Sequence, residues 1–182
     1  MIEKTNSYPK TTIKIWNNEA PTSIMYGSHA TPFGQCLIAI LDNMICYLSF
    51  SPDKQVGLED LKKVWAPCTI KEDTKQTKAL IEQIFASKPT NNTLSLLLKG
   101  TPFQVAVWQV LAKIPSGQTV AYENIAKAIG KPKAIRAAAS AVGMNNIAYL
   151  IPCHRVIAKS GALGGFKWGL GLKKALLSHE NV

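Results

Sequence analysis

The chain changes character at Gly100, and this change limits the folds open to it. Before Gly100, short apolar runs separated by turn residues predict strands, and Asp42-Asn43 between two of them is a two-residue turn typical of a β-hairpin. Two stretches with helical spacing accompany these runs, so we predict a small mixed α/β unit. The expected strands are 24–27, 36–41, 44–50 and 93–98, and the expected helices are 57–65 and 75–85.

The second half of the chain has a helical pattern. Thr101 is a typical helix N-cap, and Pro102 suits the first helical position, so a helix is expected to begin there. The preceding segment 86–93 is polar and rich in turn residues, which predicts a connector between the two halves.

A helix-turn-helix is predicted in the middle of the second half. Residues 119–129 and 133–142 have helical patterns, Gly130 suits a left-handed C-cap of the first helix, and Pro132 suits the first turn of the second. Alanine fills most of the second helix, which leaves Arg136 as its one long charged side chain beyond its first residue. So thin a helix can approach a nucleic-acid groove closely, although the same alanines also suit plain packing against the first helix.

Positive charge gathers in this same half. Residues 1–100 hold eleven Lys and Arg against nine Asp and Glu, whereas residues 101–182 hold ten against two. The asymmetry indicates a polyanionic partner, with nucleic acid as the first candidate and an anionic membrane surface as the second. A solvated basic face is the alternative, but it leaves unexplained why nearly all the acidic residues lie elsewhere.

Pro152-Cys153-His154-Arg155 sets a thiol beside an imidazole after the apolar run 147–151, for which we predict a buried strand. A free cysteine has a pKa of about 8.5, so a reactive Cys153 needs help from a base, and His154 is the adjacent candidate. Because successive side chains of a strand point to opposite faces, the two groups would meet through a water molecule or a local turn. The alternative is an inert cysteine that packs in the core.

Several classes of protein are disfavoured. Cys36, Cys46 and Cys68 form no CxxC or Cys/His cluster with Cys153, which argues against a zinc site and a disulfide framework. No apolar run approaches the roughly 20 residues that cross a bilayer, and the first ten residues lack the apolar core of a signal peptide. We therefore expect a cytoplasmic protein with no membrane partner, no metal and no cofactor.

The motifs of the second half resemble those of the O6-alkylguanine-DNA alkyltransferases, also known as methylated-DNA–protein-cysteine methyltransferases, and above all the C-terminal repair domain of bacterial Ada-type proteins. The resemblance covers residues 100 to about 180. Its motifs, in order, are Thr101-Pro102-Phe103-Gln104 with Val107-Trp108, the helix-turn-helix around Tyr122 and Arg136, Asn145, Ile151-Pro152-Cys153-His154-Arg155-Val156, Gly165-Phe166-Lys167-Trp168-Gly169, and a closing helix with Lys173 and Glu180.

The resemblance implies an α/β fold of two domains. Residues 1–92, followed by a linker to about 100, would form a ribonuclease-H-like mixed α/β domain, for which the match is in layout only. Residues 101–182 would form a mostly helical, winged-helix-like domain that contains the helix-turn-helix, binds DNA and accepts the alkyl group.

The implied activity is stoichiometric DNA repair, in which Cys153 irreversibly takes the alkyl group from O6 of guanine and each molecule acts once. Such a displacement needs a thiolate in line with the departing oxygen and a base for the thiol proton. His154 would be that base, through a water molecule, and Glu180 would orient the imidazole. The family assigns protonation of guanine N3 to the tyrosine at Tyr122, and a hinge role to the asparagine at Asn145.

The resemblance also implies how DNA is held. A damaged base must leave the stack to reach a buried thiol, and an arginine finger on a helix in the minor groove would fill the vacated space. The partner would be double-stranded DNA containing O6-alkylguanine, bound without sequence preference by a monomer in the cytoplasm, at the nucleoid. The residues that contact DNA would be Arg136 as the finger, Ala137, Tyr122, Lys131 and Lys133.

The base pocket would be formed by Val156, Phe166, Lys167 and Trp168. By analogy, the carbonyls of Cys153 and Val156 would accept from the guanine amino group, and the backbone around Lys167 would donate to O6. Phe166 stands where many relatives have tyrosine, so packing against the base is kept and a tyrosine hydroxyl contact is lost.

Other functions fit parts of the sequence. A non-catalytic alkyltransferase-like damage binder would lack the acceptor cysteine, which is present as Cys153. An unrelated thiol hydrolase using Cys153 and His154 would turn over small substrates without DNA, which the basic second half and the helix-turn-helix disfavour. A transcriptional regulator of the full Ada type would need a further zinc-cysteine domain, which Cys36, Cys46 and Cys68 do not supply.

Overall fold

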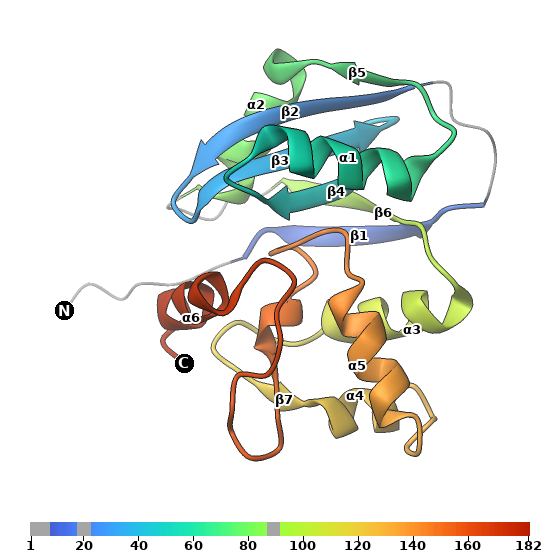
Figure 1. The fold of residues 1–182 in the computed structure, drawn as a ribbon, viewed down its shortest axis with the longest axis vertical. Helices are drawn as coiled ribbons and strands as arrows, with labels where there is room; N and C mark the ends of the chain where they lie inside the picture. Colours follow the sequence, from blue (N-terminus) through green and yellow to red (C-terminus); the bar gives the residue numbers. More distant parts are fainter. Residues whose placement is uncertain (1–7, 18–22, 87–91) are drawn as a thin grey trace.

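The computed structural model describes residues 8–17, 23–86 and 92–182. A sheet with two helices is built from the first half of the chain, and a mostly helical unit built from the second half packs below it (Figure 1). The fold is thus mixed α/β. Within the part of the chain that the structure describes, none of the helices is both long and apolar enough to cross a lipid bilayer.

The first half forms a six-stranded sheet in the order β1-β6-β4-β3-β2-β5. β2, β3 and β4 pair antiparallel, while β1 with β6, β4 with β6 and β2 with β5 pair parallel. The strands predicted within β2, β3, β4 and β6 are confirmed, and β1 and β5 are additions to them. The strands are β1 (Lys10–Ile15), β2 (Ile24–Thr31), β3 (Gly34–Leu41), β4 (Met44–Phe50), β5 (Ile70–Glu72) and β6 (Thr93–Leu98).

The predicted β-hairpin is confirmed between β3 and β4. Asp42 and Asn43 both have positive φ, at 49° and 61°. Two consecutive left-handed residues form the turn whose twist matches that of the flanking strands, and Asp and Asn tolerate this conformation better than most residues.

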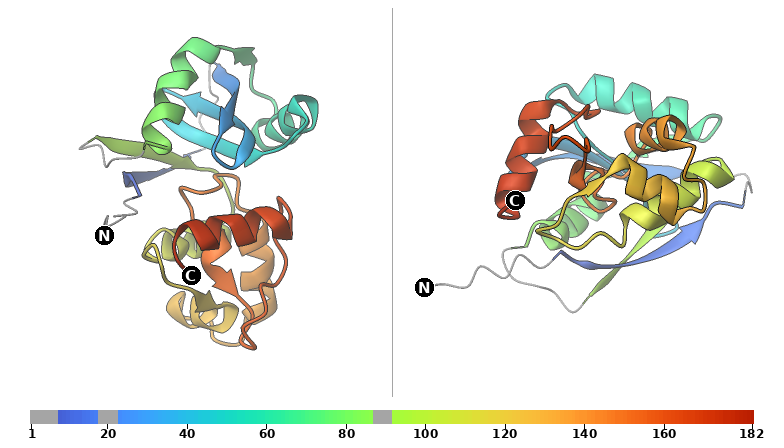
Figure 2. Two further views of the ribbon diagram at one scale, coloured as in Figure 1. Left: turned by 90° about the vertical axis from the view of Figure 1, so that its left-hand side faces the viewer. Right: turned by 90° about the horizontal axis from the view of Figure 1, so that it is seen from below.

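Helices α1 (Lys54–Trp65) and α2 (Thr74–Ile84) cover opposite faces of the sheet (Figure 2). They confirm the predicted helices, and each begins at an aspartate N-cap, Asp53 or Asp73, whose side chain accepts a backbone amide. β3 serves both faces because its side chains alternate. Leu37, Ala39 and Leu41 point to one face and pack with α1. Ile38 and Ile40 point to the other face and pack with α2 and with the core of the second half.

The second half begins at the predicted cap. The side chain of Thr101 accepts from the amide of Gln104, and the side chain of Gln104 accepts from the amide of Thr101. This capping box starts α3, and Trp108 of α3 donates from Nε1 to the carbonyl of Ala141 in α5 at 2.9 Å. The elements are α3 (Pro102–Leu111), β7 (Val120–Ala121), α4 (Tyr122–Ala128), α5 (Ile135–Gly143), the 3-10 turn η1 (Cys153–Arg155), β8 (Val156–Ile157) and α6 (Leu170–His179).

The two-helix unit predicted around Gly130 is present as α4 and α5. Gly130 follows the C-cap of α4 with a φ of +72°, as predicted for a left-handed cap. The expectation for Pro132 is wrong, because α5 begins only at Ile135 and Pro132 lies in the turn before its N-cap, Ala134. The segment predicted as a connector, 86–93, includes residues 87–91, which lie outside the described residues.

The buried strand predicted at 147–151 is wrong. Only Ile147 pairs, in an isolated parallel bridge with Leu48 of β4, and the chain then turns, with Tyr149 at a φ of +66°. Two backbone hydrogen bonds, Leu48 to Asn146 at 2.9 Å and Ala148 to Leu48 at 2.8 Å, tie this segment to the sheet. The run is apolar because it is enclosed between the two halves of the molecule.

Candidate active site

Glu180, at the C-cap of α6, accepts hydrogen bonds on both carboxylate oxygens although it is only 4% exposed. Oε1 accepts from Nε2 of His154 at 2.6 Å, from Nη2 of Arg155 at 3.0 Å and from the hydroxyl of Tyr8. Oε2 accepts from Nε of Arg155 at 2.9 Å and from the amide of Gly117 at 3.1 Å. These five residues are termed the Glu180 cluster.

The cluster fixes the protonation of its members. Burial by itself would raise the pKa of Glu180, but hydrogen bonds from His154, Arg155 and Tyr8 outweigh it and lower that pKa to about 2. A charged carboxylate only accepts, so Nε2 of His154 carries the proton that it shares with Glu180, and Nδ1 keeps its lone pair. Among the described residues Nδ1 has no hydrogen-bond partner.

His154 is therefore arranged as a neutral base. Burial lowers its pKa, and the positive charges of Arg155 and Lys173 act in the same direction, against the raising effect of Glu180. At neutral pH its Nδ1 can accept a proton, and Glu180 holds the ring from the other side.

Cys153 begins the turn η1 and is 4% exposed. Its Sγ accepts from Nδ2 of Asn145 at 3.2 Å, and in the described residues no hydrogen bond joins it to His154. Burial raises the pKa of the thiol to about 11, while Asn145, Lys173 and Lys167 act to lower it. The resting thiol is protonated, so its reaction needs a base.

Asn145 determines the path of the segment that carries the thiol. It follows α5, is 1% exposed, and donates from Nδ2 to the carbonyls of Ile151 at 2.9 Å and Ile147 at 3.3 Å as well as to Cys153. Its Oδ1 accepts from the amide of Ile147 at 2.9 Å. The side-chain amide of Asn145 thereby holds both ends of the turn between Ile147 and Ile151. Asn145, which we predicted as a hinge, is also in contact with Sγ of Cys153.

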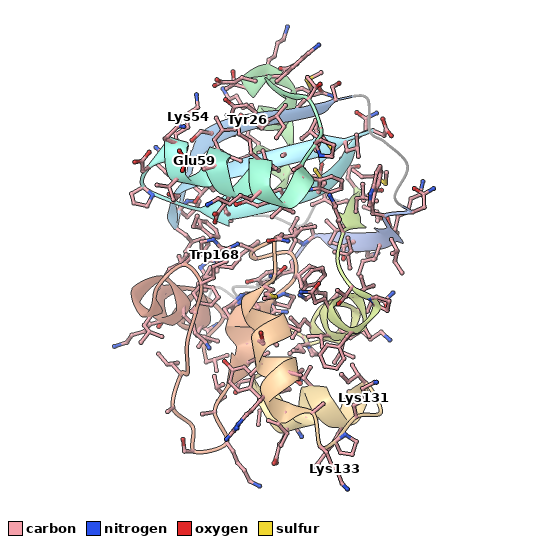
Figure 3. The ribbon with its side chains drawn as sticks, turned by 45° about the vertical axis from the view of Figure 1, so that its right-hand side comes forward. Tyr26, Lys54, Glu59, Lys131, Lys133 and Trp168 are labelled. Carbon is pink, nitrogen blue, oxygen red and sulfur yellow. The ribbon has the colours of Figure 1, made fainter. Side chains whose placement is uncertain are left out.

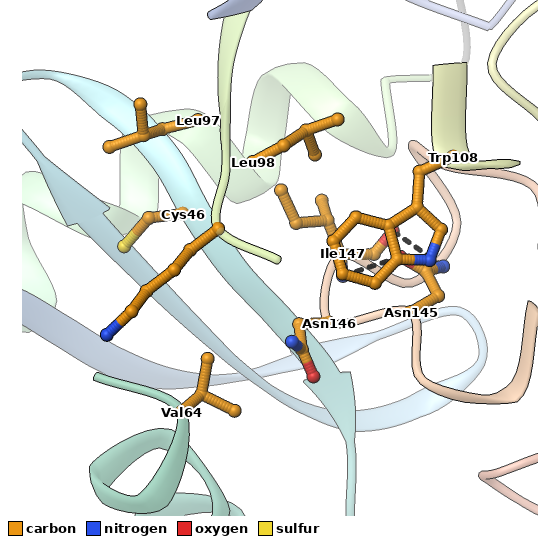
Figure 4. Close-up of a pocket in the computed structure, with 9 residues that line it drawn as sticks. Cys46, Val64, Leu97, Leu98, Trp108, Asn145, Asn146 and Ile147 are labelled. Carbon is orange, nitrogen blue, oxygen red and sulfur yellow. Dashed lines mark hydrogen bonds between the residues drawn. The ribbon is translucent and has the colours of Figure 1, made fainter. Parts of the chain in front are cut away.

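A small cavity lies beside Asn145, between the two halves of the molecule (Figure 4). Its volume of about 10 Å³ is near the lower limit for one water molecule. Cys153 is not part of its lining, so it does not correspond to the predicted base pocket. The lining residues are Cys46, Val64, Leu97, Leu98, Lys99, Trp108, Asn145, Asn146 and Ile147.

Lys173 joins the predicted pocket loop to the strand after the thiol. Its buried Nζ donates to the carbonyl of Val156 at 2.6 Å and to those of Leu163 and Gly165. Burial lowers its pKa to about 8, opposed by the nearby Cys153. The Val156 carbonyl, which we predicted to accept from guanine, already accepts from Lys173, and its second lone pair remains for another donor.

The other predicted pocket residues lie on or against the same loop. The rings of Phe166 and Trp168 pack edge to face at 5.3 Å, and Nζ of Lys167 lies 5.6 Å from the Trp168 ring. The Tyr122 hydroxyl lies 3.1 Å from the position a Cβ would take on Gly164, whose φ of +68° also favours glycine. Burial raises the pKa of Tyr122, and the nearby Cys153 adds to the rise.

Comparison with known proteins decides the family. A family model described as the DNA-binding domain of 6-O-methylguanine DNA methyltransferase matches residues 102–182. The constitutive methylated-DNA–protein-cysteine methyltransferase of Bacillus subtilis is 38% identical over 160 residues, which cover 86% of this chain and 95% of that protein. The chain belongs to the methylated-DNA–protein-cysteine methyltransferase family.

Two further matches bear on this family assignment. The Ada protein of Escherichia coli, named as a bifunctional transcriptional activator and DNA repair enzyme, is 37% identical over 161 residues, but the match covers 87% of this chain and 46% of that protein. The chain thus spans about half the length of Ada. The crystal structure of Mycobacterium tuberculosis OGT in complex with DNA matches with a TM-score of 0.68 and 31% identity, over 86% of this chain and 92% of that one.

The residues predicted to contact DNA are exposed, with the exception of Tyr122. Arg136 and Ala137 are exposed on α5, whereas Ala138 and Ala141 are buried and pack the helix against its neighbours. Lys131 and Lys133 lie in the turn before α5, at the end of the molecule away from the sheet (Figure 3). Tyr122 is half-buried at the start of α4.

Sequence reasoning gave four residues of this site no role. Arg155 and Lys173 lie within the quoted motifs, and a basic residue two positions after the candidate nucleophile is a signal that could have pointed to Arg155. Gly117 contributes only its backbone amide, and Tyr8 lies far away in the sequence, so no local pattern points to either of them.

Proposed function

We propose that this protein repairs O6-alkylguanine in double-stranded DNA by transferring the alkyl group irreversibly to Cys153, once per molecule. The observation that carries the proposal is the buried thiol of Cys153 held by Asn145, next along the chain to an imidazole that Glu180 fixes from behind. A sulfur and a base on one turn, with a carboxylate brought to the base from the end of α6, form the arrangement that activates a nucleophile.

The proposed reaction proceeds in one displacement. The thiol proton passes through a water molecule to Nδ1 of His154, the sulfur attacks the alkyl carbon, and the bond from that carbon to O6 breaks. Tyr122 donates a proton to N3 of the leaving guanine and becomes a phenolate. The phenolate then takes a proton from water, and His154 returns to water the proton that it took from the thiol. The products are an S-alkylcysteine and guanine, with no cofactor required.

We further propose that the turn between α4 and α5, with α5 itself, is a helix-turn-helix that enters the minor groove. The exposed Arg136 would replace the flipped base in the stack, and the small exposed Ala137 beside it would allow close approach. Lys131 and Lys133 would contact phosphates, which adds affinity without sequence preference. The protein would act as a monomer in the cytoplasm, on nucleoid DNA.

The finer fold description is part of the same proposal. Residues 1–92, together with β6 in the segment to about 100 that we predicted as a linker, would be a ribonuclease-H-like domain, and residues 101–182 would be a winged-helix-like alkyl-acceptor domain. Val156, Phe166, Lys167 and Trp168 would enclose the flipped guanine, since they lie on β8 and the loop before α6.

A duplex with a single O6-methylguanine tests this function directly. We expect one methyl group per protein molecule, found by peptide mass analysis on the peptide that contains Cys153, together with unmodified guanine in the DNA. Repeated turnover, a methyl group on another residue, or DNA-independent hydrolysis of a small thiol-reactive ester would contradict the proposal, and the last result would favour the thiol hydrolase.

Arg136→Ala separates base flipping from chemistry. We expect repair in duplex DNA to fall by about 100-fold, because the cost of an unfilled stack is a few kcal/mol, while methyl transfer from free O6-methylguanine base changes little. Lys71→Ala removes a positive charge from the exposed face of β5 and is the charge-matched control. Equal losses with both substrates would show that Arg136 acts on the fold or on the thiol instead.

A further inference from the structure

Tyr8 reaches the active site from the other end of the chain. It precedes β1, the strand that pairs with β6, whereas its contacts belong to η1, to the segment before it and to the end of α6. Its ring stacks on Tyr149 with centroids 4.4 Å apart, and the guanidinium of Arg155 lies over the ring at 4.2 Å. The Tyr8 hydroxyl donates to Oε1 of Glu180.

Oε1 of Glu180 is also the oxygen that holds the imidazole. It accepts from Tyr8 and from Nε2 of His154, and the Tyr8 oxygen lies 3.4 Å from that same Nε2. Packing alone would account for the stacked ring of Tyr8. It does not account for a hydroxyl directed at a buried carboxylate, because a phenylalanine would fill the same space without the cost of burying a polar group.

We propose that Tyr8 is a positioning residue of the alkyl-acceptor site. Its phenolic hydroxyl holds Glu180 against His154 and takes up part of the negative charge of the Glu180 carboxylate. This inference rests on the proposed function, since His154 must act as a base for Tyr8 to matter. It gives Tyr8, a residue of the first half of the chain, a part in chemistry that the second half otherwise performs by itself.

The physical effect acts on the proton affinity of His154. A hydrogen bond to a carboxylate disperses the negative charge of the carboxylate. With the hydrogen bond from Tyr8, Glu180 therefore stabilises the imidazolium form of His154 less than it would without that bond. Tyr8 thereby helps to keep His154 neutral and able to accept the thiol proton. Among the described residues, the charged and titratable groups that face His154 are Tyr8, Tyr149, Arg155, Lys173 and Glu180, and Cys153 is its neighbour in the chain.

Removal of the hydroxyl changes this balance in a known direction. Without Tyr8 as a donor, more negative charge stays on the oxygen next to Nε2, imidazolium is favoured and the pKa of His154 rises. As the pH is lowered, a base with a raised pKa becomes protonated at a higher pH and is then inactive. The acid limb of the rate profile therefore moves to higher pH.

Tyr8→Phe tests the inference because it keeps the ring and removes only the oxygen. We measure the single-turnover rate of methyl transfer from O6-methylguanine duplex across the acid to neutral range. We expect the midpoint of the acid limb to rise by about 0.5 to 1 pH unit, with only a few-fold change on the neutral plateau. NMR titration of the three histidine rings, without DNA, should show the same upward shift for His154 alone.

Tyr26→Phe is the matched control, because the Tyr26 hydroxyl also donates to a carboxylate, that of Glu72, at 3.2 Å. Tyr26 lies in the sheet near Lys54 (Figure 3). The profile of Tyr26→Phe should match the wild type. A Tyr8→Phe protein with an unshifted acid limb, or with a rate lowered equally at every pH, would overturn the inference, because a packing residue behaves in that way. If the wild-type protein takes up no methyl group, the proposed function fails first.

Discussion

We expect Cys153→Ala to abolish methyl transfer and to leave DNA binding intact. The substitution removes the sulfur that is proposed to attack the alkyl carbon. Alanine has no atom that can form this bond, however well the base and the other residues are oriented. We expect a loss of roughly a million-fold, the size seen when a protease loses its nucleophile, which means no detectable transfer in a single-turnover assay.

The fold should survive this change. Sγ of Cys153 accepts one hydrogen bond from Asn145, but the same amide keeps the carbonyls of Ile147 and Ile151 as acceptors. Loss of one buried sulfur leaves a small cavity, so we expect the free energy of unfolding to fall by about 1 to 2 kcal/mol. Thermal denaturation and fluorescence anisotropy with labelled duplex check stability and binding separately.

Cys153→Ser is the closer variant, since a hydroxyl can still accept from Asn145. It should bind O6-methylguanine duplex like the wild type and remain inactive, because an alcohol loses its proton far less readily than a thiol. Methyl transfer by either variant, or a methyl group that appears on Cys36, Cys46 or Cys68 in the wild type, would show that the acceptor has been misidentified.

Local signals in the sequence predicted much of the fold. The Asp42-Asn43 turn, the Thr101 cap and the C-cap at Gly130 each depend on the conformational preference of one or two residues, and all three are confirmed. β1 and β5 escaped prediction for a physical reason. β1 is an edge strand rich in lysine and threonine, and β5 has only three residues, so neither carries a run of buried side chains.

The apolar run 147–151 shows where a local pattern misleads. Its composition indicates burial, which is correct, but a strand also needs a partner for its backbone groups. Here the side chain of Asn145 takes the carbonyls of Ile147 and Ile151, and the turn at Tyr149 leaves a single bridge to Leu48. A polar residue outside the run thus decides its conformation.

The candidate site divides in the same way. Cys153 and His154 are adjacent, so one short motif points to both, and the resemblance to a family adds Glu180. Tyr8 lies 172 residues from Glu180, and no spacing rule connects them. Only the fold, in which Tyr8 just before β1 lies against the end of α6, brings that hydroxyl to the carboxylate.

Glu180→Ala is expected to have the largest effect on stability of any single change at this site. The carboxylate accepts five hydrogen bonds, two of them from Arg155, which is itself 3% exposed. Its removal leaves a buried guanidinium without its counter-charge. Breaking a buried ion pair in this way costs about 3 to 5 kcal/mol, so we expect that loss in the free energy of unfolding by chemical denaturation.

Glu180→Gln separates charge from hydrogen bonding. Glutamine keeps one acceptor oxygen for Nε2 of His154, but it removes the charge that Arg155 needs and adds an amide group that faces the donors. We expect an intermediate loss of stability. Methyl transfer should also fall, because a neutral amide holds the imidazole and does not stabilise its protonated form as the thiol proton arrives. Glu72→Gln, at an exposed pair with Lys54, should cost little and is the control.

The pH dependence of stability gives the sharpest test of this buried charge. The pKa of Glu180 is lowered to about 2 in the folded protein, against about 4.3 for an unfolded glutamate, so its contribution is complete above the unfolded value and is lost as pH falls towards 2. We expect about 3 kcal/mol of the wild-type stability to disappear over that range, and Glu180→Gln to lack this part of the acid loss. Parallel acid profiles for the two proteins would mean that the carboxylate is not held charged by its donors, and the assignment of His154 as a neutral base would fail with it.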